Sequence, residues 1–170
     1  MGLFGETPEE KQIKKEKSVA FWGKTLQPIG QIVQDALCIL TLDPDNKKLV
    51  INNEKKQITL PYDRIRSFTI VDEVTLEKSG SGLGGAIAGG LLFGVAGAIV
   101  GSGLDKGKTK IKWFGALKYV DKDGKECELN FVEMAFTGFY QEKIKNPAAD
   151  KFERVVNEIA ARNSEDINEL

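Results

Sequence analysis

Short apolar runs separated by turn residues make up most of the chain after residue 35. Runs of this length, bounded by Asp, Asn, Pro and Gly, predict β-strands joined by tight turns. We predict six strands, at residues 36–42, 48–52, 57–60, 65–76, 110–120 and 125–133. In the last strand, Cys127, Leu129 and Phe131 alternate with polar residues. This alternation predicts one face packed on a core and the other facing outward.

Two further segments have helical patterns. Thr7 and Pro8 predict a helix start, with a capping hydroxyl followed by proline at the first helical position. This helix would run to about Lys17, and with Ile13 as its only apolar anchor it would be a solvated arm. Near the C-terminus, Asn146 can cap a second helix. Its apolar residues have the spacing of a stripe that lies on a core: Phe152, Val155, Val156, Ile159 and Ala160.

These elements predict a mainly β protein with some α-helix. Antiparallel strands followed by one amphipathic helix are typical of a small barrel or half-barrel that the C-terminal helix caps. We divide the chain into a charged N-terminal arm at 1–34, one domain at 35–162 with an insertion at 79–108, and an acidic tail at 163–170. We expect the tail, after Arg162, to fray.

The insertion contains the most unusual stretch of the sequence. Residues 83–104 carry no charge and comprise 13 apolar residues, eight glycines and one serine. About 20 apolar residues can cross a bilayer. A single crossing, however, would place the strands at 65–76 and 110–120 on opposite sides of the membrane. We therefore predict a hairpin of two short helices that break near Phe93 and Gly94, each arm about 15 Å long.

Within this stretch, large and small residues form separate rows at a spacing of four. Small rows of this kind let helix backbones approach closely, which is the glycine-zipper pattern. In water such a helix is unfavourable, because each glycine costs about 1 kcal/mol relative to alanine. We expect the zipper to form an oligomer or membrane interface. The close-packing residues are Gly85, Gly89, Gly90, Gly94, Gly97 and Gly101, and the buried apolar face comprises Ile87, Leu91, Phe93, Val95 and Ile99.

Basic residues follow the insertion and suggest a contact with an anionic surface. Lys106, Lys108, Lys110 and Lys112 alternate along the chain, where they can meet lipid headgroups. The same pattern also fits the solvated edge of a strand. A flexible glycine loop is a further interpretation of the insertion, although it would leave nine large apolar residues in water.

Two motifs resemble a known family. The turn Leu60-Pro61-Tyr62-Asp63-Arg64-Ile65 and the glycine-rich run from Gly89 to Gly101 resemble pleckstrin-homology-like (PH-like) domains of bacteria and their phages. The resemblance covers about residues 35–162 and implies a PH-like barrel with an inserted glycine-rich hairpin. Some relatives carry an N-terminal Cys-rich ribbon. This chain lacks those cysteines, so the metal site they imply is not expected here.

Composition narrows the chemistry. The chain has 170 residues, 24 basic and 25 acidic, and no histidine. The absence of histidine excludes Ser-His-Asp and Cys-His nucleophile systems and His-ligated zinc. The near-neutral charge does not favour nucleic-acid binding. Cys38 and Cys127 lie in apolar stretches without a paired-cysteine motif, which fits buried thiols in a reducing cytoplasm. We expect no catalytic residues, cofactor or metal.

The sequence thus predicts a non-enzymatic PH-like interaction module. We expect it to self-associate as a homo-oligomer or to dock on a membrane through the glycine-zipper hairpin. The protein would then be cytoplasmic, or attached at the inner face of the membrane. The alternative is a soluble inhibitor or ligand-sequestering protein, for example phage-encoded, that acts on a host target through its barrel mouth.

Overall fold

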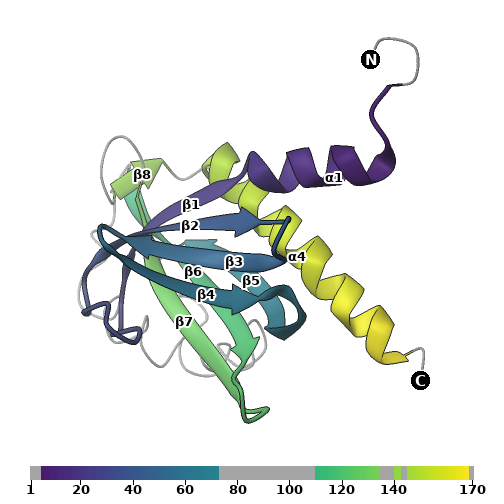
Figure 1. The fold of residues 1–170 in the computed structure, drawn as a ribbon. Coiled ribbons are helices and arrows are strands. Elements are labelled where there is room, and N and C mark those ends of the chain that lie inside the picture. The colour runs from purple at the N-terminus through teal and green to yellow at the C-terminus, as the bar shows by residue number, and fades with distance from the viewer. Residues whose placement is uncertain (1–4, 73–109, 135–139, 143–144, 169–170) are drawn as a thin grey trace.

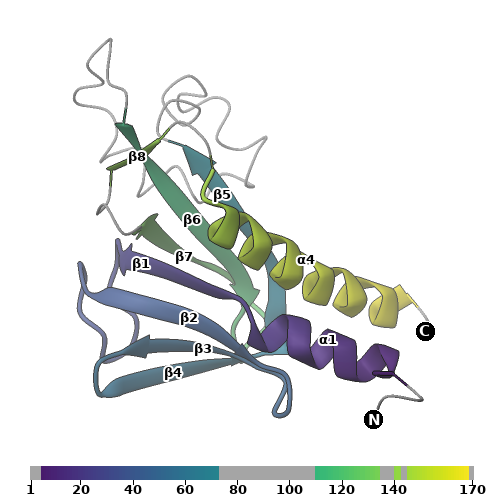
Figure 2. The ribbon, with the colours of Figure 1, turned by 90° about the horizontal axis from the view of Figure 1, so that it is seen from above.

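The computed structural model describes residues 5–72, 110–134, 140–142 and 145–168. Seven strands form one antiparallel sheet in the order β4-β3-β2-β1-β7-β6-β5, and β8 pairs with β6 outside this path. The sheet bends around a core without closing, and helix α4 lies along the open side (Figures 1 and 2). This is the predicted half-barrel with its C-terminal helix.

The strand bounds agree closely with the sequence-based predictions. All six predicted strands are present, with residues 73–76 of the fourth lying outside the described residues, and the structure adds β1 and β8. The strands are β1 (Ala20–Thr25), β2 (Leu37–Asp43), β3 (Lys48–Asn53), β4 (Lys56–Pro61), β5 (Ile65–Asp72), β6 (Lys110–Val120), β7 (Glu126–Glu133) and β8 (Tyr140–Glu142).

Strand β1 lies within the range that the sequence assigned to the N-terminal arm. It pairs with β2 on one side and β7 on the other, so it joins the two halves of the sheet. Its residues Phe21 and Thr25 are buried, while Trp22 remains about half exposed. With glycine and lysine interrupting its pattern, the run Ala20–Thr25 carries a weak local strand signal. Pairing with two neighbours places it in the sheet.

Four phenylalanines meet at the centre of the core. Phe21 lies 5.1 Å from Phe68, 6.0 Å from Phe152 and 6.1 Å from Phe131, measured between ring centroids. Phe152 belongs to α4 (Pro147–Asn168), whose whole predicted apolar stripe is buried. Because the rings come from two halves of the sheet and from the helix, this cluster fixes their relative positions.

Two polar contacts fix α4 against the sheet. The side chain of Asn146 caps the helix, as predicted, by accepting a hydrogen bond of 3.1 Å from the Ala148 amide, and it donates one of 3.0 Å to Glu133 on β7. Further along, the amide group of Asn157 bonds both the N–H and the carbonyl of Phe68, at 2.8 Å each. Asn157 thereby satisfies backbone groups on the edge of β5 where the described residues form no further strand.

The prediction of a frayed tail after Arg162 is wrong for most of that range. Helix α4 continues to Asn168. Asn163 explains part of this extension, because its side chain donates hydrogen bonds to the carbonyls of Tyr62 and Ile65, at 2.6 and 3.1 Å. A tertiary contact of this kind leaves no trace in the local sequence pattern.

The alternation predicted for β7 is correct only on its core side. Leu129 and Phe131 are buried against the core, and Glu126 on the opposite side is exposed. Glu128 and Asn130 also point away from the core, yet they are at most 9% exposed. This side of the strand is therefore covered, contrary to the prediction of an outward-facing polar surface.

Candidate functional site

The predicted glycine-zipper interface lies outside the described residues. This applies to all of its glycines and apolar residues between positions 85 and 101, and to Lys106 and Lys108. The structure does describe the two strands on either side of them. β5 ends at Asp72 and β6 begins at Lys110, and these strands are antiparallel neighbours with Asp72 opposite Trp113. The chain thus leaves and re-enters the sheet at the same end.

The remaining two lysines of the predicted anionic-surface contact are on β6. Lys110 pairs with Glu142 and Lys112 with Tyr140, both in β8. Lys112 is half-buried and lies on the side of β6 opposite the core. These positions place both residues beside the point where the insertion rejoins the sheet.

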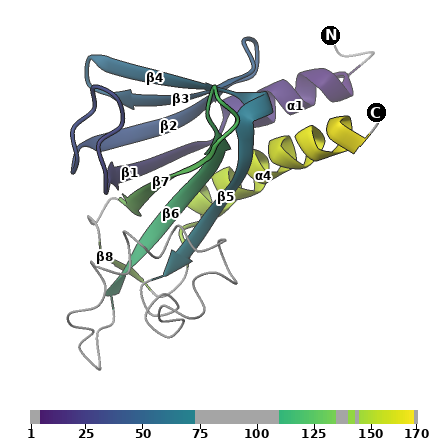
Figure 3. The ribbon, with the colours of Figure 1, turned by 90° about the horizontal axis from the view of Figure 1, so that it is seen from below.

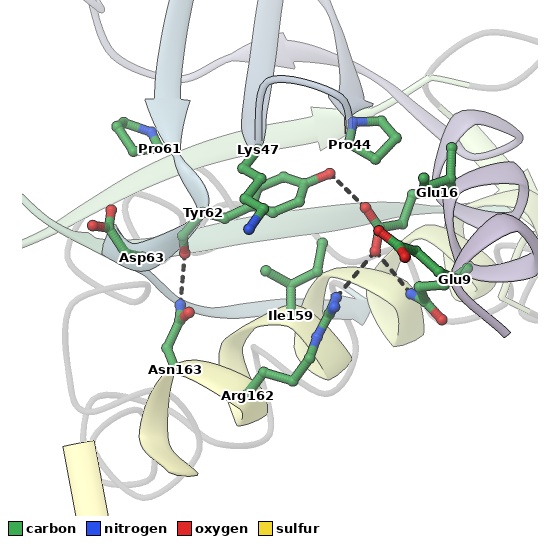
Figure 4. Close-up of a pocket in the computed structure, with 12 residues that line it drawn as sticks. Glu9, Glu16, Pro44, Lys47, Pro61, Tyr62, Asp63, Ile159, Arg162 and Asn163 are labelled. Carbon is green, nitrogen blue, oxygen red and sulfur yellow. Dashed lines mark hydrogen bonds and ion pairs between the residues drawn. The ribbon is translucent and has the colours of Figure 1, made fainter. Parts of the chain in front are cut away.

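A cavity of about 650 Å³ lies between the two helices and the turns of the sheet. Helix α1 (Pro8–Lys17) forms one wall, α4 another, and the short helix η1 (Tyr62–Arg64) and the β2–β3 turn complete it (Figure 4). Its lining comprises Glu9, Gln12, Ile13, Glu16, Pro44, Lys47, Pro61, Tyr62, Asp63, Ile159, Arg162 and Asn163.

Glu16 is the buried charged group of this cavity. Its side chain is 3% exposed and accepts hydrogen bonds from the Tyr62 hydroxyl at 2.8 Å, Arg162 at 3.0 Å and Gln12 at 2.8 Å (Figure 4). A buried carboxylate is stable only when it is paired and hydrogen-bonded, and here donors come from three different elements. Helix α1 is therefore docked on the domain, where the sequence predicted a solvated arm.

The electrostatics of the cavity suit a structural contact. Burial, followed by the hydrogen bond to Glu16, raises the pKa of Tyr62 well above its ordinary value. The phenol stays protonated and acts as a donor to Glu16 throughout the physiological pH range. The hydrogen bonds from Tyr62 and Arg162 to Glu16 hold α1 against η1 and α4.

A second buried polar group lies on β7, on the side away from the core. Both carboxylate oxygens of Glu128 and the side-chain oxygen of Asn130 lack a hydrogen-bond partner. Burial raises the pKa of Glu128 to about 7, although Lys118 on the neighbouring strand acts in the opposite direction. Gln27 is nearby and binds the Glu128 carbonyl and the Asn130 amide. The alternating pattern of β7 gave no indication of this burial.

Comparison with known proteins identifies the family. Residues 29–120, more than half of the chain, match the family model described as the glycine zipper containing PH domain. The chain belongs to this family. A search of curated proteins finds no match.

The match to the glycine-zipper PH family spans β2 to β6 and includes the insertion between β5 and β6. It ends at the last residue of β6, so β7 and α4 lie beyond it. PH-like domains are typically interaction modules without catalytic activity, which agrees with the function class predicted from the sequence. The bacterial or phage origin suggested by the resemblance is not part of this finding.

No helix in the described ranges has the length and apolar character needed to cross a membrane. In the same part of the chain, no three Cys, Asp or Glu side chains gather as candidate metal ligands.

Proposed function

We propose that this PH-like domain attaches to an anionic membrane surface or to a second copy of itself through its glycine-zipper segment, and has no enzymatic role. The antiparallel pairing of β5 with β6 is the observation that carries the proposal. It brings both ends of the insertion to one end of the sheet. An apolar segment held in this way can enter a surface as a hairpin and return, with the folded domain remaining on one side.

The energetics of the segment require a covering surface. Burying one large apolar side chain contributes about 1.5–3 kcal/mol, and residues 83–104 contain nine of them. Their exposure in water would favour association. The glycines work against an isolated helix but permit close backbone contact with a partner. Between a second copy and a membrane, the lysines that follow the segment favour an anionic membrane. They include Lys110 and Lys112 on β6.

The test compares two double substitutions in the full-length chain. Gly90→Leu with Gly94→Leu fills the small-residue rows. Ala88→Leu with Ala96→Leu adds apolar volume outside those rows and is the matched control. We expect the wild type and the control to float with vesicles containing phosphatidylserine, or to sediment as an oligomer. The glycine variant should lose this behaviour, with an unchanged circular dichroism spectrum.

The same measurements identify the surface. Flotation with anionic vesicles, but not with neutral ones, supports membrane docking, whereas sedimentation as an oligomer without lipid supports self-association. A wild-type chain that stays monomeric and floats with neither vesicle contradicts the proposal and favours a soluble binding protein. Equal flotation and sedimentation of wild type and glycine variant also contradicts it.

A further inference from the structure

A second apolar surface lies on the side of β5, β6 and β7 that faces away from the core. Strand alternation assigns Val71, Phe114, Ala116 and Val132 to this side, which we call the outer face. Phe114 is at its centre, directly opposite Val71 on one neighbouring strand and Val132 on the other. Trp113 and Leu117, with the opposite orientation, belong to the core.

The outer face is buried although it is not part of the core. None of its four residues is more than 7% exposed, and Phe114 has no exposed surface. All four are absent from the hydrophobic cluster that packs around α4. Figure 3 shows that α1 and α4 lie on the other side of these strands. The described helices therefore do not cover this surface.

The chain itself supplies a suitable cover. The residues between Asp72 and Lys110 start two positions after Val71 and end five positions before Phe114. They are thus tethered at the outer face at both ends, which gives them a high effective concentration there. They also contain the uncharged stretch 83–104, with apolar residues spaced to form one continuous row.

We infer that the glycine-zipper segment of the same chain packs its large apolar row on the outer face. In this arrangement the row of Leu83, Ile87, Leu91, Val95 and Ile99 covers Phe114 and its neighbours. The small-residue rows then remain available for close contact with a second copy of the chain. This last point rests on the proposed function, whereas the packing itself does not.

A cysteine reporter tests the packing without membranes or partners. Ala116→Cys places a thiol on the outer face, in a Cys127→Ser background where the remaining Cys38 is fully buried. Thr41→Cys is the matched control, because Thr41 is half-buried and lies on the side of β2 that faces away from the core. We expect the thiol at 116 to react with a soluble disulfide reagent at least tenfold more slowly than the thiol at 41.

A second set of substitutions identifies the cover. Replacing Ile87, Leu91, Val95 and Ile99 by serine should raise the reaction rate at position 116 at least tenfold and leave position 41 unchanged. The inference is overturned if the thiol at 116 stays protected after these replacements. It is also overturned if this thiol reacts rapidly while the segment is unmodified. If dilution of the protein removes the protection, the cover comes from a second copy of the chain, and the inference is overturned. Unchanged circular dichroism and an unreactive Cys38 confirm that each variant is folded.

Discussion

Arg162 on α4 donates a hydrogen bond of 3.0 Å to Glu16 on α1, and the two residues are 146 positions apart. The Glu16 side chain is 3% exposed and the Arg162 side chain 50%. This pair joins the N-terminal helix to the C-terminal helix across the open side of the half-barrel. Removing the cation from a pair whose carboxylate is buried costs more than breaking an exposed pair, because it leaves an unpaired charge in the interior.

Replacing Arg162 therefore has a larger effect than the same replacement elsewhere on the helix. We expect Arg162→Met to lower the free energy of unfolding by about 1–3 kcal/mol, measured by urea denaturation. Arg154→Met is the matched control. Arg154 is 71% exposed and pairs with Asp150 on the same helix, so its loss should have no measurable effect. Equal losses of unfolding free energy in the two variants would show that the burial of Glu16 does not increase the cost of removing its partner.

The buried carboxyl group of Glu128 should make stability depend on pH. Its pKa is about 7 in the folded protein, against 4.5 for an ordinary glutamate. The folded state thus holds this proton more tightly than the unfolded state. Its contribution to stability is full below about pH 4.5 and is lost as the pH rises to 7. We expect Glu128→Gln to stabilise the protein by about 2–3 kcal/mol at pH 8 and to have little effect at pH 4.5.

Glu126→Gln is the control for this prediction, because Glu126 is exposed on the same side of the same strand. Its unfolding free energy should follow the wild type at every pH. Thermal or urea unfolding at several pH values gives the comparison. A constant difference between Glu128→Gln and wild type, independent of pH, would rule out titration of this group.

At Gly115 on β6, the strand preference for alanine and the space left by the core predict opposite effects of a substitution by alanine. In a strand, alanine is favoured over glycine by roughly 0.5–1 kcal/mol. A Cβ at position 115, however, would lie 2.9 Å from the rings of both Phe21 and Phe68. Both rings are buried in the central cluster, so they have little room to move. We expect Gly115→Ala to destabilise the protein by about 1–3 kcal/mol in urea unfolding. A variant as stable as wild type would contradict this.

The sequence by itself determined six strands, their turns and both helix starts. Each depends on residues close together in the chain, such as the alternating run before Glu133 or the cap formed by Thr7, whose hydroxyl accepts a hydrogen bond of 3.1 Å from the Glu10 amide. The glycine-zipper spacing is local as well, and it led to the family that the comparison confirmed.

Only the tertiary structure decided the remaining features. Strand β1 exists because β2 and β7 pair with it, and the Asn163 hydrogen bond to the Tyr62 carbonyl explains part of the continuation of α4 past Arg162. The burial of Glu16 and of Phe114 likewise depends on elements distant in sequence. A residue's own pattern reports which face it occupies but not what lies against that face, since the covering surface comes from elsewhere in the chain or from a partner.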